Sequence, residues 1–256
     1  MRHVAVWTEL SAYRGAVGEL SASTRRAEGQ AGAICVVPGA GRWWDAATRA
    51  VDAGACAVVI ADPDVGPAPA VSRLDAVTHA GVPVIVERPR LRADVIADAQ
   101  LAAPPLMILA DVVASAKSAR ASSRDAIGWL RALTGGPPTV LSVARGRHSL
   151  IAALETTAGV PAALSITTSR VDTCPAIDVI AIGDSRLELR IDDATGTRSI
   201  RQVRAEGALE PAARLESSAR LALRRALAAV AGEPVADLDE LCSDSSVDAL
   251  LWPDHA

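Results

Sequence analysis

The sequence has very few aromatic residues: it contains no phenylalanine, one tyrosine and five tryptophans among 256 residues. Aliphatic side chains must therefore fill its core. Proteins that bind single-stranded nucleic acids stack bases on aromatic side chains along a basic groove. This chain has a net charge of −4, and its arginines form no basic stripe. These features argue against a nucleic acid partner.

Long apolar runs are also absent, because charged residues interrupt every hydrophobic stretch before the roughly 20 residues that cross a membrane. The first residues lack the basic and apolar segments of a signal peptide, so we expect a cytoplasmic protein with no membrane contact. No CxxC motif and no histidine pair at ligand spacing is present, so we expect reduced, buried thiols and no metal site. The four cysteines are Cys35, Cys56, Cys174 and Cys242.

Half of the chain is hydrophobic and 22% is charged, which indicates a folded protein with one large domain or two small ones. In the first hundred residues, short β-branched runs alternate with helix-period segments, a pattern typical of βαβ units and a parallel sheet. The expected strands are residues 3–7, 33–37, 57–61 and 83–87, and the expected helices are residues 43–53 and 71–80. We therefore predict a Rossmann-like domain over residues 1–103.

The organisation changes after Pro104 and Pro105. A polar, alanine-rich stretch over 111–134 predicts a helix, and short strands joined by glycine-containing turns follow it. These strands are residues 140–144, 150–156, 162–168, 177–182, 187–191 and 199–203, and the last helices are residues 211–230 and 238–251. The pattern predicts an α+β domain over 104–256, with a mostly antiparallel sheet that has one open face.

Two segments carry a resemblance to a known family. Residues 57–91 read AVVIADPDVGPAPAVSRLDAVTHAGVPVIVERPRL, and residues 125–135 read DAIGWLRALTG. A strand ending in D-P, then a helix, then G-x-x-V-x-x-E-R-P resembles the Gfo/Idh/MocA family of NAD(P)-dependent sugar and cyclitol oxidoreductases. The second segment is similar to the helix that carries this family's catalytic histidine. Residues 152–169 and 178–191 are similar to the sheet whose open face makes its dimers.

The sequence departs from that family at the cofactor loop. The first strand should lead into G-x-G-x-x-G, whose glycines let the backbone approach the pyrophosphate. Here residues 8–13 read TELSAY and contain no glycine, and Glu9 adds a negative charge. A second glycine pair, Gly39 and Gly41 followed by Arg42, could bind a phosphate or could simply form a tight turn. The resemblance adds Asp62, Pro63 and Glu87 as cofactor-binding candidates.

The proton-transfer residues also differ. Arg88 stands where the family has a lysine, and Asp125 stands where it has its acid/base histidine. A guanidinium can orient a substrate but transfers protons poorly. Arg88 could instead form an ion pair with Glu87, and Asp125 could instead cap a helix or be a solvated charge. The run between Pro89 and Asp125 is also shorter than in the family, which implies a more open substrate pocket.

One basic turn remains unexplained by the resemblance. Arg145, Arg147 and His148 lie between two expected strands and could form an anion-binding edge or a solvated turn.

These departures leave two functions open. The first is an oxidoreductase-fold protein that has lost normal dinucleotide binding and hydride transfer and acts as a binding, assembly or regulatory subunit, with no cofactor. The second is an active NAD(P)-dependent oxidoreductase for a sugar-like or cyclic hydroxy or keto substrate, with an atypical cofactor site. In either case an open sheet with an apolar face predicts a homo-oligomer, or a hetero-oligomer with an active homologue.

Overall fold

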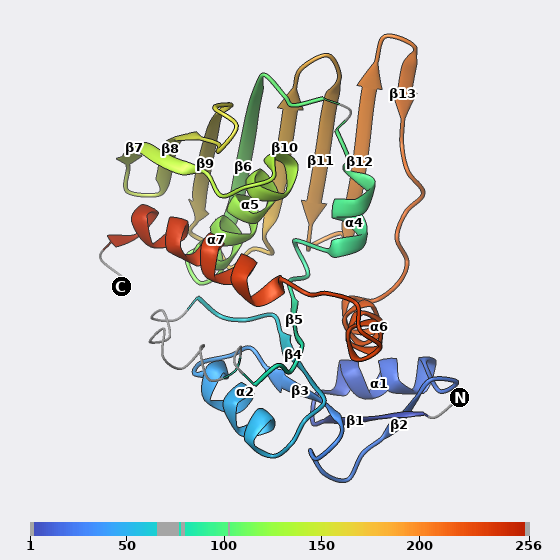
Figure 1. Ribbon diagram of the computed structural model, residues 1–256. Helices are drawn as coiled ribbons and strands as arrows, with labels where there is room; N and C mark the ends of the chain where they lie inside the picture. Colours follow the sequence, from blue (N-terminus) through green and yellow to red (C-terminus); the bar gives the residue numbers. More distant parts are fainter. Residues whose placement is uncertain (1–2, 66–76, 78–79, 102, 254–256) are drawn as a thin grey trace. The chain divides into compact units, whose positions relative to one another are not determined.

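The computed structural model describes residues 3–65, 77, 80–101 and 103–253, and it divides into two compact units (Figure 1). Unit 1 comprises Met1–Pro89 and Leu215–Leu241, and unit 2 comprises Arg90–Arg214 and Cys242–Ala256. The first change of unit is therefore at residue 90 rather than at the predicted residue 104. The chain also returns to unit 1 for residues 215–241, which the order of elements in the sequence did not indicate.

Unit 1 contains a parallel sheet, sheet A, with the strand order β2-β1-β3-β4-β5. Its strands are β1 (Val4–Thr8), β2 (Thr24–Arg26), β3 (Ile34–Pro38), β4 (Ala57–Ala61) and β5 (Val84–Glu87). The apolar runs of β3 and β4 are buried at every position but the last, as expected for strands covered on both faces. The predicted Rossmann-like sheet is confirmed.

Helices cover both faces of sheet A. Alternate strand residues, among them Val36, Val59 and Ile85, form one core with α1 (Ser11–Glu19) and α6 (Ser218–Val230). The opposite alternation faces α2 (Trp43–Asp52), which packs on β3 and β4. Helix α6 begins at Ser218, later than the predicted residue 211, because Ser217 caps it by accepting a hydrogen bond from the amide of Arg220. The predicted helix over 71–80, with His79, lies mostly outside the described residues.

At β5, one of the two edge strands of sheet A, a side chain binds a main-chain amide. Among the described strands, β5 pairs with β4 alone, and the amide of Val86 donates a hydrogen bond of 2.9 Å to Oδ2 of Asp237. The guanidinium of Arg225 holds both oxygens of the same carboxylate at 2.7 Å. A charged side chain therefore occupies one backbone donor that a sixth strand would use.

Unit 2 contains an eight-stranded sheet, sheet B, with the strand order β13-β12-β11-β10-β6-β9-β8-β7. Its strands are β6 (Met107–Ser115), β7 (Thr139–Arg145), β8 (Ser149–Glu155), β9 (Pro161–Ser169), β10 (Ala176–Ile182), β11 (Arg186–Asp192), β12 (Thr197–Arg204) and β13 (Gly207–Leu209). All neighbours are antiparallel except β6 and β9. The predicted mostly antiparallel sheet is confirmed.

The prediction of a helix over 111–134 is wrong at its start. Residues 107–115 form β6, a central strand paired with both β9 and β10, and α5 (Ala119–Thr134) begins only after it. Side chains along β6 alternate between buried and more exposed, which is the strand period rather than the helix period. Helix α5 ends where expected, at Gly135 in the left-handed conformation (φ 79°).

One face of sheet B packs on α5, and α4 (Ala93–Asp98) packs on α5 and on strand β12. Helix α5 is buried along most of its length, including Arg124 and Asp125. Helix α7 (Asp237–Leu251) begins in unit 1 and continues in unit 2, where Asp244 and Asp248 form ion pairs with arginines of α5. Among the residues that the structure describes, no helix is long and apolar enough to span a bilayer.

Candidate functional site

The loops that follow the parallel strands of sheet A meet at one edge, which we call the carboxyl edge. It comprises residues 8–13, 39–42, 62–64 and 87–89. Open parallel sheets bind ligands at this edge. Backbone hydrogen bonds join the amide of Gly39 to the carbonyl of Ala61, and the amide of Asp62 to the carbonyl of Glu87. The structure thus brings the predicted residues Gly39, Asp62 and Glu87 together here.

Side chains occupy all three glycine positions of the first loop. Counting from the end of β1, the spacing of G-x-G-x-x-G falls on Thr8, Leu10 and Tyr13. The hydroxyl of Thr8 accepts a hydrogen bond of 3.1 Å from the amide of Leu10. In dinucleotide-binding folds these glycines allow a tight turn, close approach of the pyrophosphate and close packing of the helix. In this chain each of the three positions carries a side chain instead.

Tyr13 extends from α1 to the end of β5. Its hydroxyl donates a hydrogen bond of 2.7 Å to Oε2 of Glu87, and its side chain is almost fully buried. Burial, followed by the negative charges of Glu87 and Asp62, raises the pKa of the Tyr13 phenol well above its usual range. Tyr13 is not among the site residues predicted from the sequence, although it is the only tyrosine and stands at the third glycine position.

The second glycine pair forms a turn that is bonded to the next loop. A Cβ on Gly39 would lie 2.5 Å from Pro63 Cα and would also collide with the carbonyl oxygen of Ala61. The amide of Gly41 donates to Oδ2 of Asp64 at 3.0 Å, and the amide of Asp64 donates to the carbonyl of Gly39 at 2.7 Å. This backbone contact accounts for Gly39 without a ligand.

Carboxylates also occupy donors that a phosphate would need in this turn. Asp64 accepts from Gly41, and Asp45 forms an ion pair of 2.9 Å with Arg42. A phosphate bound to these donors would have to displace the two carboxylates or lie beside them, and like charges repel. The geometry therefore favours a structural turn.

The strand order shows a further reduction on one side of sheet A. Doubly wound dinucleotide-binding sheets commonly have the order 3-2-1-4-5-6, with two strands on the outer side of the first strand. Here only the three-residue β2 lies outside β1, and no helix or strand occurs between Arg26 and Ile34, a segment described throughout. One outer strand and its crossover helix are therefore missing from the first nucleotide-binding half.

The two predicted catalytic residues belong to different units. Arg88 directly follows β5 in unit 1 and is buried. Asp125 lies within α5 in unit 2, is fully buried, and accepts a hydrogen bond of 3.0 Å from Nε of Arg90. Asp193 binds the same arginine at 3.2 Å. Asp125 is therefore neither a helix cap nor a solvated charge, because it belongs to a buried ion-pair network.

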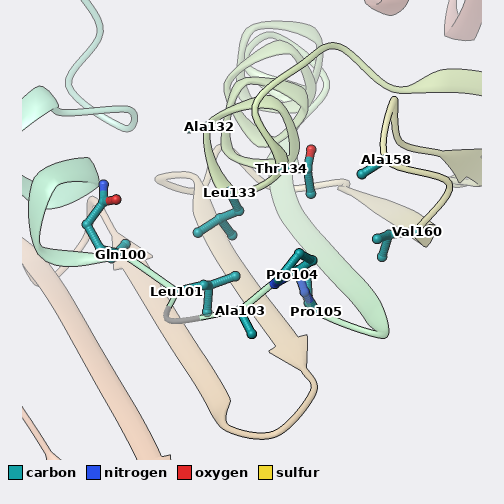
Figure 2. A pocket seen from close by; sticks show the side chains of 11 residues that line it. Gln100, Leu101, Ala103, Pro104, Pro105, Ala132, Leu133, Thr134, Ala158 and Val160 are labelled. Carbon is teal, nitrogen blue, oxygen red and sulfur yellow. The ribbon is translucent and has the colours of Figure 1, made fainter.

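A cavity of about 270 Å³ lies in unit 2 at the end of α5 (Figure 2). Alanine, leucine, proline and valine side chains form most of its wall, with Gln100 and Thr134 as the polar contributors. No charged side chain is among its described lining residues, and it includes none of the predicted site residues. It therefore offers no acid–base or ion-pairing chemistry.

The open face of sheet B carries exposed apolar side chains on strands β10, β6 and β8. They are Ile182 on β10, Met107 and Val113 on β6, and Ile151 on β8, between 39% and 56% exposed. Asp111 and Asp178 lie directly opposite each other on β6 and β10 within this face. An apolar sheet face of this kind is typical of a surface covered by a partner.

Solved structures share this fold. The UDP-N-acetylglucosamine 3-dehydrogenase GnnA from Acidithiobacillus ferrooxidans matches with a TM-score of 0.69 and 13% identity, over 98% of this chain and 97% of that chain. A dehydrogenase, MviM, from Clostridium difficile matches with a TM-score of 0.66 and 7% identity, over 98% and 90%. A 3-ketoreductase from Actinomadura kijaniata, in complex with TDP-benzene and NADP, matches with a TM-score of 0.62 and 14% identity, over 97% and 87%.

Identities this low establish the fold alone. The predicted likeness to Gfo/Idh/MocA-type dehydrogenases is confirmed at that level, with a Rossmann-like parallel sheet and a mostly antiparallel sheet in one chain. No protein-family model matches the chain, and no curated protein matches its sequence.

Proposed function

We propose that this protein is an oxidoreductase-fold subunit that has lost normal dinucleotide binding and hydride transfer and acts in binding, assembly or regulation. The observation that carries the proposal is the contact between Tyr13 and Glu87. A buried side chain at the third glycine position bridges from the first helix to the last strand of sheet A. A pyrophosphate seated on the first loop in the usual way would require bare backbone there.

Two further observations support the same proposal. The carboxylate of Asp64 already accepts the Gly41 amide, and the outer strand of the first nucleotide-binding half is missing. In addition, Asp125 is fully buried and bonded to Arg90. A general base must lie within hydrogen-bond distance of the substrate, so this position makes Asp125 a poor general base.

The second candidate is an active NAD(P)-dependent oxidoreductase that uses Gly39, Gly41, Arg42, Arg88 and Asp125. It is favoured by the likeness to dehydrogenases, one of which was solved with NADP. Its substrate would be a sugar-like or cyclic hydroxy or keto compound.

A thermal-shift titration with NADH and NADPH separates the two candidates. A nucleotide present at 100 times its Kd adds about 2.7 kcal/mol to the free energy of unfolding. We expect no such gain with either nucleotide. The fluorescence of Trp43 and Trp44, which begin α2 directly after the Gly39–Arg42 turn, gives an independent readout. A stabilisation that the Arg42→Gln variant loses would establish an atypical cofactor site and overturn the first candidate.

We further propose that the open face of sheet B is covered by a second copy of the chain or by an active homologue. Light scattering should give an oligomer when the protein is studied alone, if the partner is a second copy. Ile151→Arg, in the open face, should dissociate it, whereas Leu215→Arg should not, since Leu215 is exposed outside sheet B. A monomer at high concentration, with no homologue captured by the intact face, contradicts this assembly.

We also assign the protein to the cytoplasm. None of its four cysteines, all of which the structure describes, forms a disulfide, as expected in a reducing compartment. Mass spectrometry of alkylated protein from cells would detect any disulfide that contradicts this location.

A further inference from the structure

The arginines of unit 2 fall into two groups. Most lie within 4.0 Å of a carboxylate. These are Arg90, Arg92, Arg120, Arg124, Arg131, Arg186, Arg190, Arg198, Arg201 and Arg214. Arg145, Arg147, Arg170 and Arg204 are different, since no carboxylate among the described residues lies within that distance of them. Arg204 donates instead to Oε1 of Gln202 on β12 at 3.0 Å. Arg145, Arg147 and Arg170 are exposed and lie in one part of sheet B.

The fold brings these arginines together with a histidine. The turn between β7 and β8 carries Arg147 and His148, and the carbonyl of His148 accepts a hydrogen bond of 2.8 Å from the amide of Thr168 on β9. This bond fixes the turn against the end of β9, where Arg170 follows. Nε of Arg170 donates to Nε2 of His148 at 3.3 Å, although the two residues are 22 positions apart. We call Arg145, Arg147, His148 and Arg170 the basic corner.

Part of the basic corner is held in place by the backbone. Nη2 of Arg145 donates to the carbonyl of Leu251 at 3.0 Å, at the end of α7. Gly146 closes the turn with a hydrogen bond of 2.8 Å to Ser149, and a Cβ on Gly146 would lie 2.7 Å from the Ser149 hydroxyl. Because Arg170 uses Nε for His148, its two terminal nitrogens keep donors for a ligand.

Positive side chains that share one turn and the adjoining strand end repel one another, and carboxylates neutralise most other arginines of unit 2. In a chain of net charge −4, a basic cluster with no carboxylate within 4.0 Å among the described residues attracts an external anion. Several guanidinium groups suit a dianion with three or more acceptor oxygens, since each arginine presents paired donors. The basic corner contains no phenylalanine, tyrosine or tryptophan, and the imidazole of His148 is bonded to Arg170, which disfavours the base stacking of single-stranded nucleic acid.

We propose that the basic corner binds the phosphate group of a small phosphorylated molecule. Arg147 and Arg170 contact the phosphate oxygens, His148 positions Arg170, and Arg145 adds positive charge from the edge strand β7. This site is separate from the carboxyl edge and does not depend on whether a dinucleotide binds in unit 1.

Isothermal titration with inorganic phosphate, at constant ionic strength set with chloride, tests the proposal on the full chain. We expect saturable binding with a Kd on the order of 1 mM for the bare ion. The double variant Arg147→Gln/Arg170→Gln should bind at least about tenfold more weakly, because two charge-assisted hydrogen bonds are lost. The matched control is Arg186→Gln/Arg201→Gln, which removes two exposed arginines of sheet B that already have carboxylate partners. It should keep its affinity within twofold.

Circular dichroism confirms that both double variants are folded before affinities are compared. Absence of saturable binding in the wild type overturns the proposal, and so does equal binding by wild type and the Arg147→Gln/Arg170→Gln variant. Binding of a single-stranded oligonucleotide much more tightly than phosphate, lost in the same variant, also overturns it and assigns the corner to nucleic acid. Because the ligand is inorganic phosphate, none of these outcomes changes with the result of the NADH and NADPH titration.

Discussion

The carboxyl edge of sheet A and the basic corner of sheet B differ in whether their hydrogen-bond donors already have a carboxylate acceptor within the chain. At the carboxyl edge the chain supplies its own negative groups. Asp64 accepts the Gly41 amide, and Glu87 accepts the Tyr13 hydroxyl. At the basic corner the arginines lack such partners among the described residues. At the carboxyl edge, carboxylates of the chain therefore occupy two hydrogen-bond donors, whereas the basic corner carries positive charge with no carboxylate within 4.0 Å among the described residues.

This contrast teaches that a shared fold does not fix where a ligand binds. The carboxyl edge still lies at the ends of parallel strands, but side chains stand at the three glycine positions, and carboxylates bind the Gly41 amide and the Tyr13 hydroxyl. Whether an anion can bind depends on which donors remain without an internal acceptor.

The largest expected effect comes from breaking an ion pair of unit 2 whose carboxylate is buried. Asp244 is fully buried and binds Arg131 at 2.8 Å, with the arginine side chain only 12% exposed. Asp244→Ala should lower the free energy of unfolding by about 3–5 kcal/mol, because it removes the buried carboxylate of this ion pair. Urea denaturation measures the loss. Asp239→Ala, at an exposed position of the same helix, should change it by less than about 0.5 kcal/mol. Equal effects of the two variants would contradict a stabilising role for the ion pair.

The next effect tests the turn at the carboxyl edge. Gly39→Ala should cost about 2–3 kcal/mol, because its Cβ would collide with backbone atoms of Ala61 and Pro63. Gly41→Ala should cost only about 1 kcal/mol, since its φ of 60° is strained for alanine but nothing lies within 4 Å of the added Cβ. Thermal denaturation compares the two. The reverse order would contradict the close contact of Gly39 with Ala61 and Pro63.

Alkaline pH tests the contact between Tyr13 and Glu87. The folded state holds the Tyr13 pKa above its unfolded value of 10.0, so the stabilisation is complete below that pH and is lost as pH rises above it. Above pH 10.0 the wild type should lose about 1.4 kcal/mol more per pH unit than Tyr13→Phe, which has no phenol to ionise. Urea unfolding at several pH values gives this difference.

A direct readout accompanies that measurement, because Tyr13 is the only tyrosine in the chain. Tyrosinate absorbance of the native protein reports on this residue alone. An absorbance step near pH 10.0 before unfolding would show that the phenol is accessible to solvent and that the carboxyl edge is open.

The smallest effect is expected at the basic corner. Arg147→Gln and Arg170→Gln should each change the free energy of unfolding by less than about 0.5 kcal/mol, since both side chains are exposed and have no carboxylate partner to lose. Guanidinium chloride is unsuitable for this measurement because it screens charges, so urea is used. A loss above about 1 kcal/mol would show that these arginines stabilise the fold and would weaken the contrast with the carboxyl edge.

Local sequence patterns were sufficient for most of the fold. The apolar run of β4 was predicted at its observed bounds, and the strands of sheet B with clear alternation were found within two residues at either end. Strand β6 was missed because alanine, aspartate and serine weaken its strand propensity, and its stability comes from pairing with β9 and β10. The return of α6 to unit 1 was missed for a similar reason, because packing between distant segments determines it.

The candidate site was less predictable. The loss of the three glycines was visible in the sequence, but the bond from Tyr13 to Glu87 joins residues 74 positions apart. Only the strand order places these residues together. In the same way, the burial of Asp125 depends on Arg90, 35 positions earlier, and no local pattern distinguishes that carboxylate from a solvated one.

The hydrogen bond from the Val86 amide of β5 to the Asp237 carboxylate affects whether chains can associate through this strand. Outer strands with bare main-chain groups recruit other chains, which leads to domain exchange or fibrils. An invading strand would have to displace Asp237 from the Val86 amide and separate it from Arg225. The Asp237 side chain therefore makes the addition of a strand from another chain at β5 less favourable.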